Sequence, residues 1–451
     1  MTRTQKNMVR FVLLTAALAL TFSAAKPASS AWLDGVKKVK IREKEYPICP
    51  REEWIKAGLP VREVRDEENA AIEYIKAINL YVEEPEKLRD IYDYVQQNVW
   101  VEEASALLLW LKENEAAIAA VREGAKKKDC AFPLLKEKGE SFIAALLPHL
   151  SPMRNLARLL VIQGKYLESQ KKYREALDTY LAVTRMGYHV SKEPILISGL
   201  VGIAVDAIGA KAIEGCILRK KLDTRTLSYL LERLSSAPSP AQNYEISISG
   251  EKAFGMSIVD DIFERRLSLA DLVDENANLR EVLPLISSRS AGIRAIVKAD
   301  FRKYWNWMDE WNDLPAHVAF RPENRKDDKI INELPAWSLA KLLVPALSRA
   351  RVSFVRSKAV RAILTAQIAL EIYRNEKGGY PKKLAQLKGI LSEIPMDPFT
   401  NEPLKYKRTM DGYVVYSVNE NLADDGGDGG LSGHGKDIVG RSPLPEPEPF
   451  E

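Results

Sequence analysis

A run of oxygen-bearing residues near the C-terminal end of the chain has the composition of a site for a hard metal ion. The segment NENLADDGGDGGLSGHGKDI covers residues 419–438. Asp424, Asp425 and Asp428 supply carboxylates, Asn421 and Asp437 can add oxygens, and the glycines let backbone carbonyls turn inward. Calcium takes about six to eight such hard oxygen ligands. A solvated acidic loop is the alternative, and composition alone leaves both open.

The three cysteines are the next residues whose spacing bears on chemistry. Cys49 in YPICPR and Cys130 in DCAFP fall in expected loops, whereas Cys216 ends an apolar helical run and is expected to be a buried free thiol. No second Cys or His stands at zinc-ligand spacing from any of them. In a compartment that permits disulfides, one pair and one free thiol are expected, and we predict the pair Cys49–Cys130.

Catalytic signatures are missing from the sequence. None of the histidines has zinc-ligand spacing, and no nucleophile elbow, P-loop or dinucleotide fingerprint occurs. Asp260, Asp261 and Glu264 precede Arg265 and Arg266, which is the pattern of a charged helix face. We therefore assign no catalytic and no organic-cofactor residues. The histidines are His149, His189, His317 and His434.

An aromatic stripe on one predicted helix has two interpretations. Phe301, Tyr304, Trp305, Met308 and Trp311 recur at helical spacing. Flat aromatic faces can stack on sugar rings, and such a platform would suit a glycan-binding protein or a hydrolase. Packing in the core is the simpler interpretation.

The N-terminus has the pattern of a secretory signal peptide. Arg3, Lys6 and Arg10 precede an apolar run that is shorter than a membrane span, and small residues follow up to Ala31. We expect cleavage after residue 31, export to the periplasm or medium, and no membrane span in the mature chain. Cleavage removes four positive charges, so the formal charge of the mature chain falls from +4 to zero. Without a positive excess there is no electrostatic case for nucleic acid, and we expect no nucleic-acid partner.

Helical periodicity dominates the rest of the chain. It covers 66–124, a helix pair interrupted near 169–172, a very apolar run at 194–216, another amphipathic stretch at 222–236, and a long polar stretch at 244–279. Gly199, Gly202 and Gly209 in the apolar run predict close contact between helices. The helix pair resembles a tetratricopeptide unit at Gly164, Tyr166, Tyr173, Ala176, Leu177 and Tyr180. Since it is a single unit, we expect a tetratricopeptide-like hairpin inside a larger helical domain.

The C-terminal hundred residues combine one long helix with a hairpin. The helix is expected over 346–377 and stops at Gly378 and Gly379. The runs PLKYKR and YVVYSV are joined through Asp411-Gly412, a hairpin signal. With ALEIYRNEKGGYP, IPMDPFTNEPLKY and the Gly/Asp loop, this order resembles the globular domain of the major pseudopilins of type II secretion. The resemblance implies a calcium ion in the loop after the hairpin.

The chain departs from that family in two ways. A pseudopilin carries its assembly helix at its own N-terminus, whereas here a long helical region and a secretory leader precede the domain. Asn419 stands where the family places a glycine. The whole plan resembles that of exported bacterial proteins with a helical region fused to such a domain.

The fold class expected from these patterns is mainly α, a multi-helix domain followed by a small α+β domain. The boundaries are a signal peptide at 1–31, a helical domain at 32–345 with a sub-boundary near 237–243, a pseudopilin-like domain at 346–440 and a disordered tail at 441–451. The expected function is a non-enzymatic exported scaffold that contacts protein partners, with secretion or surface machinery as the candidate source of those partners. The alternative is an exported hydrolase or glycan-binding protein with a Trp-lined cleft.

Overall fold

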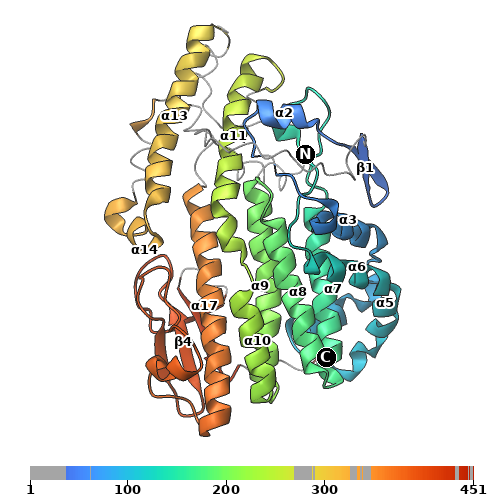
Figure 1. Ribbon diagram of the computed structural model, residues 1–451, viewed down its shortest axis with the longest axis vertical. Coiled ribbons are helices and arrows are strands. Elements are labelled where there is room, and N and C mark those ends of the chain that lie inside the picture. The colour runs from blue at the N-terminus through green and yellow to red at the C-terminus, as the bar shows by residue number, and fades with distance from the viewer. Residues whose placement is uncertain are drawn as a thin grey trace.

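The computed structural model describes residues 37–60, 62–268, 290–325, 347–431 and 436–444, with the single residues or short stretches 287, 333–335, 338, 446 and 450. The described chain is mainly helical, with a small sheet near its C-terminal end (Figure 1). The predicted signal peptide lies outside the described residues. The α-helices are α2 (Arg51–Lys56), α3 (Ala70–Leu80), α4 (Arg89–Gln97), α5 (Leu107–Glu113), α6 (Glu115–Lys126), α7 (Leu150–Ser169), α8 (Tyr173–Val190), α9 (Leu196–Arg219), α10 (Thr224–Ser236), α11 (Tyr244–Phe263), α13 (Ala291–Asp313), α14 (Ala316–Ala319) and α17 (Leu347–Lys377).

The N-terminal part is a set of short helices packed on α7. It begins with a hairpin of β1 (Lys38–Ile41) and β2 (Lys44–Pro47), which the sequence patterns did not indicate. The helical prediction for 66–124 is confirmed by α3 to α6. Asn69 caps α3 by accepting a hydrogen bond from the backbone of Ala71, and Tyr74 and Trp110 are fully buried between these helices.

Helices α7, α8 and α9 form the centre of the molecule (Figure 1). The predicted break in the helix pair is confirmed, since α7 ends at Ser169 and α8 begins at Tyr173. Gly164 lies against Tyr180 so closely that a Cβ there would stand 2.1 Å from the tyrosine ring. This close packing agrees with a helical hairpin of α7 and α8.

The apolar run predicted to be a central helix is α9. Gly202 of α9 and Gly187 of α8 face each other, and a Cβ on Gly202 would lie 2.5 Å from the Gly187 carbonyl oxygen. The prediction that the glycines allow close helix contact is confirmed. In the described part of the chain only α9 has the length and hydropathy of a membrane span, but 56% of its most apolar window is buried, as in the core helix of a folded protein.

Helix α10 packs against α8 and α17, α11 packs against α9, and α13 packs against α11. Asp223 caps α10 by accepting from the backbone of Thr226. Helix α11 ends at Phe263, and the positive φ of Arg265 is incompatible with a continuing helix. Residues 264–268 are not helical, so the helix predicted over 244–279 is wrong for this stretch. Trp305 and Trp311 of α13 are buried in the main core, which confirms the packing interpretation of the aromatic stripe.

Helix α17 is the long helix predicted at 346–377. It ends at Lys377, and the next residue, Gly378, has a φ of +75°. It packs on a four-stranded sheet of order β3-β4-β6-β5. The predicted hairpin is confirmed, with Arg408 opposite Tyr413. Strand β6 was not predicted; it pairs antiparallel with β4 and parallel with the short β5. The strands are β3 (Lys405–Arg408), β4 (Tyr413–Ser417), β5 (Gly429–Gly430) and β6 (Asp437–Ser442).

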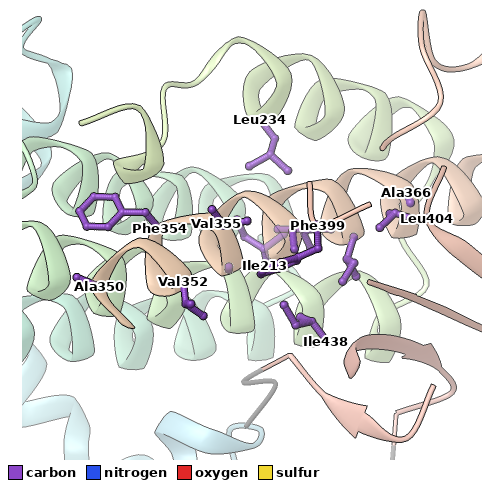
Figure 2. Packing of buried hydrophobic residues seen from close by; sticks show 14 of the residues in the cluster. Ile213, Leu234, Ala350, Val352, Phe354, Val355, Ala366, Phe399, Leu404 and Ile438 are labelled. Carbon is purple, nitrogen blue, oxygen red and sulfur yellow. The ribbon is translucent and has the colours of Figure 1, made fainter. Parts of the chain in front are cut away.

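One hydrophobic core crosses the boundary predicted at 345/346. Helix α17 contacts α9 and α10 on one side and β4 and β6 on the other. Figure 2 shows Ile213 and Leu234 of the bundle together with Phe354 of α17 and Ile438 of β6 in the same cluster. The sheet and the bundle therefore stabilise each other through α17.

Candidate functional site

The predicted metal residues lie in one loop that follows β4. Asp424 accepts hydrogen bonds from the Tyr416 hydroxyl at 2.9 Å and from the Gly426 backbone at 3.0 Å. Asn421 donates to Asp425 at 2.9 Å. Asp437 is fully buried at the start of β6, and its Oδ2 accepts from the Gly427 backbone at 2.8 Å. Four of the five predicted residues therefore take part in organising the loop.

Cationic side chains contact several oxygen atoms of the same loop. Lys407 donates to the Gly426 carbonyl at 3.0 Å and Arg441 to the Gly429 carbonyl at 2.6 Å. Asp428, the fifth predicted residue, forms an exposed ion pair with Lys436. A calcium ion would have to share Asp428 with this lysine, so Asp428 fits a ligand role less well than the others.

Asp437 is the residue of the loop that fits a cation best. Burial raises the pKa of its carboxyl group, and the neighbouring Asp425 and Asp424 add to that shift. Its Oδ1 atom is buried and has no hydrogen-bond donor among the described residues. Within those residues no group of three or more His, Cys, Asp or Glu side chains is close enough to form a ready metal site. The calcium site therefore stays a prediction, and residues 432–435 of the loop lie outside the description.

The loop is held to the sheet and to α17 by two polar residues. Buried Asp397 accepts from the Ser417 hydroxyl at 2.8 Å and from the backbone of Val418 at 2.9 Å. Asn419 has φ +61° and accepts from Arg356 of α17 at 3.0 Å. A glycine adopts such a φ freely and an asparagine tolerates it, so Asn419 suits this backbone position.

The predicted disulfide partners occupy a different place. Cys49 and Cys130 are buried free thiols in the structure, and both line one cavity in the N-terminal part. Burial raises the pKa of the Cys49 thiol to about 11 and that of Cys130 well above its usual value, so both stay protonated near neutral pH. The structure contains no bond between them, and the pairing stays a prediction. Cys216 is buried on α9, as expected.

This cavity, which we call the N-terminal cavity, has a volume of about 740 Å³. That volume falls within the range of sites that hold ligands. Prolines and aromatic residues make most of its apolar wall, and cationic residues outnumber carboxylates around it. The lining includes Pro47, Pro50, Trp54, Pro60, Phe132, Pro133 and Pro194, the cations Lys37, Lys38, Arg51, Arg62, Lys138 and Lys192, and the carboxylates Glu63, Glu137 and Glu193.

Buried polar contacts fix the inner side of the N-terminal cavity. Arg62 and Lys192 both bind Asp129, the lysine at 2.8 Å. The pKa of Asp129 is lowered because these two cations outweigh the opposing effect of burial. Glu193 contacts His149 at 3.1 Å. Asp129 therefore holds Arg62 and Lys192 in place at the cavity wall.

The carboxylates of the predicted charged face lie between α11 and α13. Asp260 pairs with Arg294 and Lys298, and Asp261 pairs with Arg266 at 2.6 Å. Glu264 shares Arg266 with Asp261 and Arg294 with Asp260. All three carboxylates are therefore paired with cations, as expected for structural ion pairs.

The described chain is a mainly helical protein with one large cavity in its N-terminal part. Comparison of the chain with protein-family models, with curated proteins and with solved structures finds no match.

Sequence reasoning missed the N-terminal cavity because its walls come from distant segments. Residues 37–69, 130–138 and 192–194 meet only in the folded chain. The two Cys-Pro-containing loops, YPICPR and DCAFP, were the one local signal, since each brings a cysteine and a proline to the wall.

Proposed function

We propose that this chain is a non-enzymatic exported interaction protein that binds a segment of a partner protein in its N-terminal cavity. The tetratricopeptide-like hairpin and the helices around it form the scaffold, and the C-terminal unit is a pseudopilin-like domain with a structural calcium ion. The mature chain works in the periplasm or outside the cell, and a component of secretion or surface machinery is the partner class that the resemblance suggests.

The lining of the N-terminal cavity is the observation that carries this proposal. Five prolines limit the backbone freedom of the wall, so little entropy is lost there on binding. The indole ring of Trp54 lies in the same wall, beside Cys49. Proteins commonly recognise partners through such aromatic anchors with a polar edge.

The charged residues of the lining indicate which kind of partner segment fits the N-terminal cavity. Six cations and three carboxylates line the cavity, which gives an excess of three positive charges before Asp129 is counted. Two of the cations, Arg62 and Lys192, are already neutralised in part by Asp129, and Lys38 pairs with Glu45 outside the lining. The remaining excess favours a segment that presents carboxylates at the rim and apolar side chains to the proline and aromatic wall.

Charge reversal at the rim tests this function. We expect Lys37→Glu/Lys138→Glu to weaken partner binding by at least roughly tenfold, which is about 1.4 kcal/mol. Lys44→Glu/Lys76→Glu is the matched control, because both lysines lie outside the lining. The measurement is quantitative affinity capture from the native envelope, followed by binding of acidic peptides from the captured protein to each purified variant. Equal binding by the rim variant and the control would refute the proposal.

Removal of calcium tests the proposed structural calcium ion in the C-terminal domain. We expect excess EDTA to lower the melting temperature of the wild-type chain, since a ligand at a hundredfold its Kd stabilises the folded state by about 2.7 kcal/mol. Asp437→Asn should abolish this sensitivity, and Asp411→Asn, an exposed residue of the same sheet region, should retain it. If the melting temperature is unchanged and elemental analysis finds no calcium, the loop does not bind a structural calcium ion.

The alternative of a Trp-lined cleft gains no support. Trp305 and Trp311 are only 1% and 3% exposed, so their faces cannot stack on a sugar without unfolding the core. Trp307 is partly buried against the same cluster. We therefore propose binding of a protein segment rather than glycan hydrolysis.

A further inference from the structure

A groove lies along α8, between α6 and α10, and we call it the α6–α10 groove. Its volume is about 980 Å³. Helix α8 contacts both neighbouring helices and forms the floor of the groove (Figure 1). The groove shares no lining residue with the N-terminal cavity, so it is independent of the proposed partner binding. The charged residues of its lining are Glu115, Arg122, Glu123, Lys126, Glu175, Asp178, Arg185 and Arg233.

Helices α6 and α8 run in the same direction along the groove. Arg122 of α6 donates a hydrogen bond to Thr179 of α8 at 2.9 Å. Further along both helices, Arg185 of α8 donates to the carbonyl of Lys127, just after α6, at 3.0 Å. Glu115 precedes Arg122 by almost two helical turns, so it lies toward the start of α8.

Helix α10 runs in that direction as well. Tyr229 of α10 donates to Asp178, near the start of α8, at 2.6 Å. Asn243, beyond the end of α10, donates to Ser191, just beyond the end of α8, at 2.8 Å. Arg233 follows Tyr229 by about one helical turn, so it lies closer to the end of α8.

The two ends of the groove therefore carry opposite charge. The end beside the start of α8 is acidic, and the other end is basic. Arg174 stacks on Tyr229, with its guanidinium carbon 3.9 Å from the ring centre, and offsets part of the acidic charge. Lys126 pairs with Glu123, which is the carboxylate in the lining of the basic end. The acidic end has Glu115, Glu175 and Asp178, and the basic end has Arg122, Lys126, Arg185 and Arg233.

Two arginines of the basic end are held in place by neutral groups. Arg122 donates through Nη2 to the side chains of Gln163 and Thr179. Arg185 donates to the backbone carbonyls of residues 127 and 128. Within the described part of the chain, no carboxylate lies at ion-pair distance from Arg122, Arg185 or Arg233. A ligand carboxylate can therefore bind to guanidinium groups that are already in position.

We propose that the α6–α10 groove binds an extended polypeptide segment that carries acidic residues at one end and basic residues at the other. The floor from Glu175 to Arg185 is about 15 Å long. An extended chain covers that length with about five residues. A polypeptide can offer both charges in this order, whereas a nucleic acid or an acidic glycan would bring negative charge to the acidic end as well.

Peptide display on the full chain tests the groove, with a library of random short peptides as the probe. The immobilised chain carries Lys37→Glu/Lys138→Glu, so that peptides for the N-terminal cavity are not enriched. We expect the enriched peptides to have acidic residues grouped at one end and basic residues at the other. In titration calorimetry at low salt, such a peptide should bind at least roughly tenfold more tightly than a peptide of the same composition with alternating charges, because only the first matches both ends.

Substitutions at the basic end assign the binding to this groove. Arg122→Gln/Arg233→Gln should weaken binding of the enriched peptide at least roughly tenfold, because charge-assisted hydrogen bonds are lost. The matched control is Arg154→Gln/Lys221→Gln, which removes two charges from exposed positions outside the groove and should leave binding unchanged. If loss of Arg122 lowers the melting temperature, Arg233→Gln alone, at an exposed position, replaces the double variant in this test.

Substitutions at the acidic end test the order of charges. Glu115→Gln/Glu175→Gln changes two exposed residues and should weaken binding of the same peptide at least roughly threefold. No enrichment of any peptide, or enrichment of peptides without separated charges, would refute the groove as a binding site for such a segment. Equal binding by the basic-end variant and its control, or no effect at the acidic end, would refute it as well.

Discussion

Gly202→Ala should lower the free energy of unfolding by about 2–3 kcal/mol, because a well-packed contact between two helices has no room for another carbon. The new Cβ would lie 2.5 Å from the Gly187 carbonyl oxygen and 2.8 Å from the Ser191 backbone nitrogen. Both are backbone atoms, so α8 and α9 must move apart. Chemical denaturation of the purified mature chain measures the effect.

A second glycine of the same helix provides the control. A Cβ on Gly215 would meet only the flexible end of Lys165, at 3.4 Å. Gly215→Ala should therefore keep or raise stability, by up to about 1 kcal/mol, because alanine is the better helix former. If both variants are equally stable, the close approach of α8 and α9 at Gly202 is not present in solution.

Asp206→Ala should be the most destabilising change of a polar residue, at about 3–5 kcal/mol. Asp206 of α9 accepts from Arg361 of α17 at 3.1 Å, and these residues are only 5% and 16% exposed at their side chains. Removal of the carboxylate leaves the arginine charge largely buried without its ion pair. The same arginine also donates to the Leu234 carbonyl at 3.2 Å, so the loss reaches α10.

Two further variants separate the charge from the packing. Burial raises the pKa of Asp206 despite the opposing effect of Arg361, so the ionised carboxylate is itself held at a cost. Asp206→Asn should therefore cost less than Asp206→Ala. Adding Arg361→Met to Asp206→Ala should recover part of the loss, since no unpaired charge remains. A double variant as unstable as the sum of both single variants would contradict the ion-pair explanation.

The helices could be predicted because each carries its own periodic signal. The ends of α7 and α8 near Ser169, and the end of α17 before Gly378, agree with the sequence patterns. Strand β6 escaped prediction because DIVGRS is short, follows a glycine-rich loop, and pairs with a strand twenty residues earlier. Such pairing is decided by tertiary contacts rather than by local preference.

The domain boundary shows a second limit of sequence patterns. The apolar residues of α17 identify a long helix, but they do not tell which elements cover its different sides. In the structure Phe354 packs near α9 and α11 residues, whereas Ile363 lies under Gly440 of β6. The predicted boundary at 345/346 therefore falls within one continuous core rather than between two.

The candidate sites were predictable to different degrees. The Gly/Asp loop was found because its residues are neighbours in sequence, and Asn419 was singled out only as a departure from the pseudopilin pattern. Arg62, Asp129 and Lys192 in or beside the N-terminal cavity lie far apart in sequence, and no spacing rule brings them together. The N-terminal cavity and the α6–α10 groove both depend on the packing of whole helices and loops.

Site-specific photo-crosslinking in the native envelope tests the central claim most directly. A photoreactive benzoylphenylalanine replaces Trp54 in the wall of the N-terminal cavity, and the control carries it in place of exposed Lys76. We predict that irradiation links position 54, and not position 76, to one partner protein through a peptide that contains acidic and apolar residues. Crosslinks at both positions to the same mixture of proteins, or none at position 54, would contradict partner binding in this cavity.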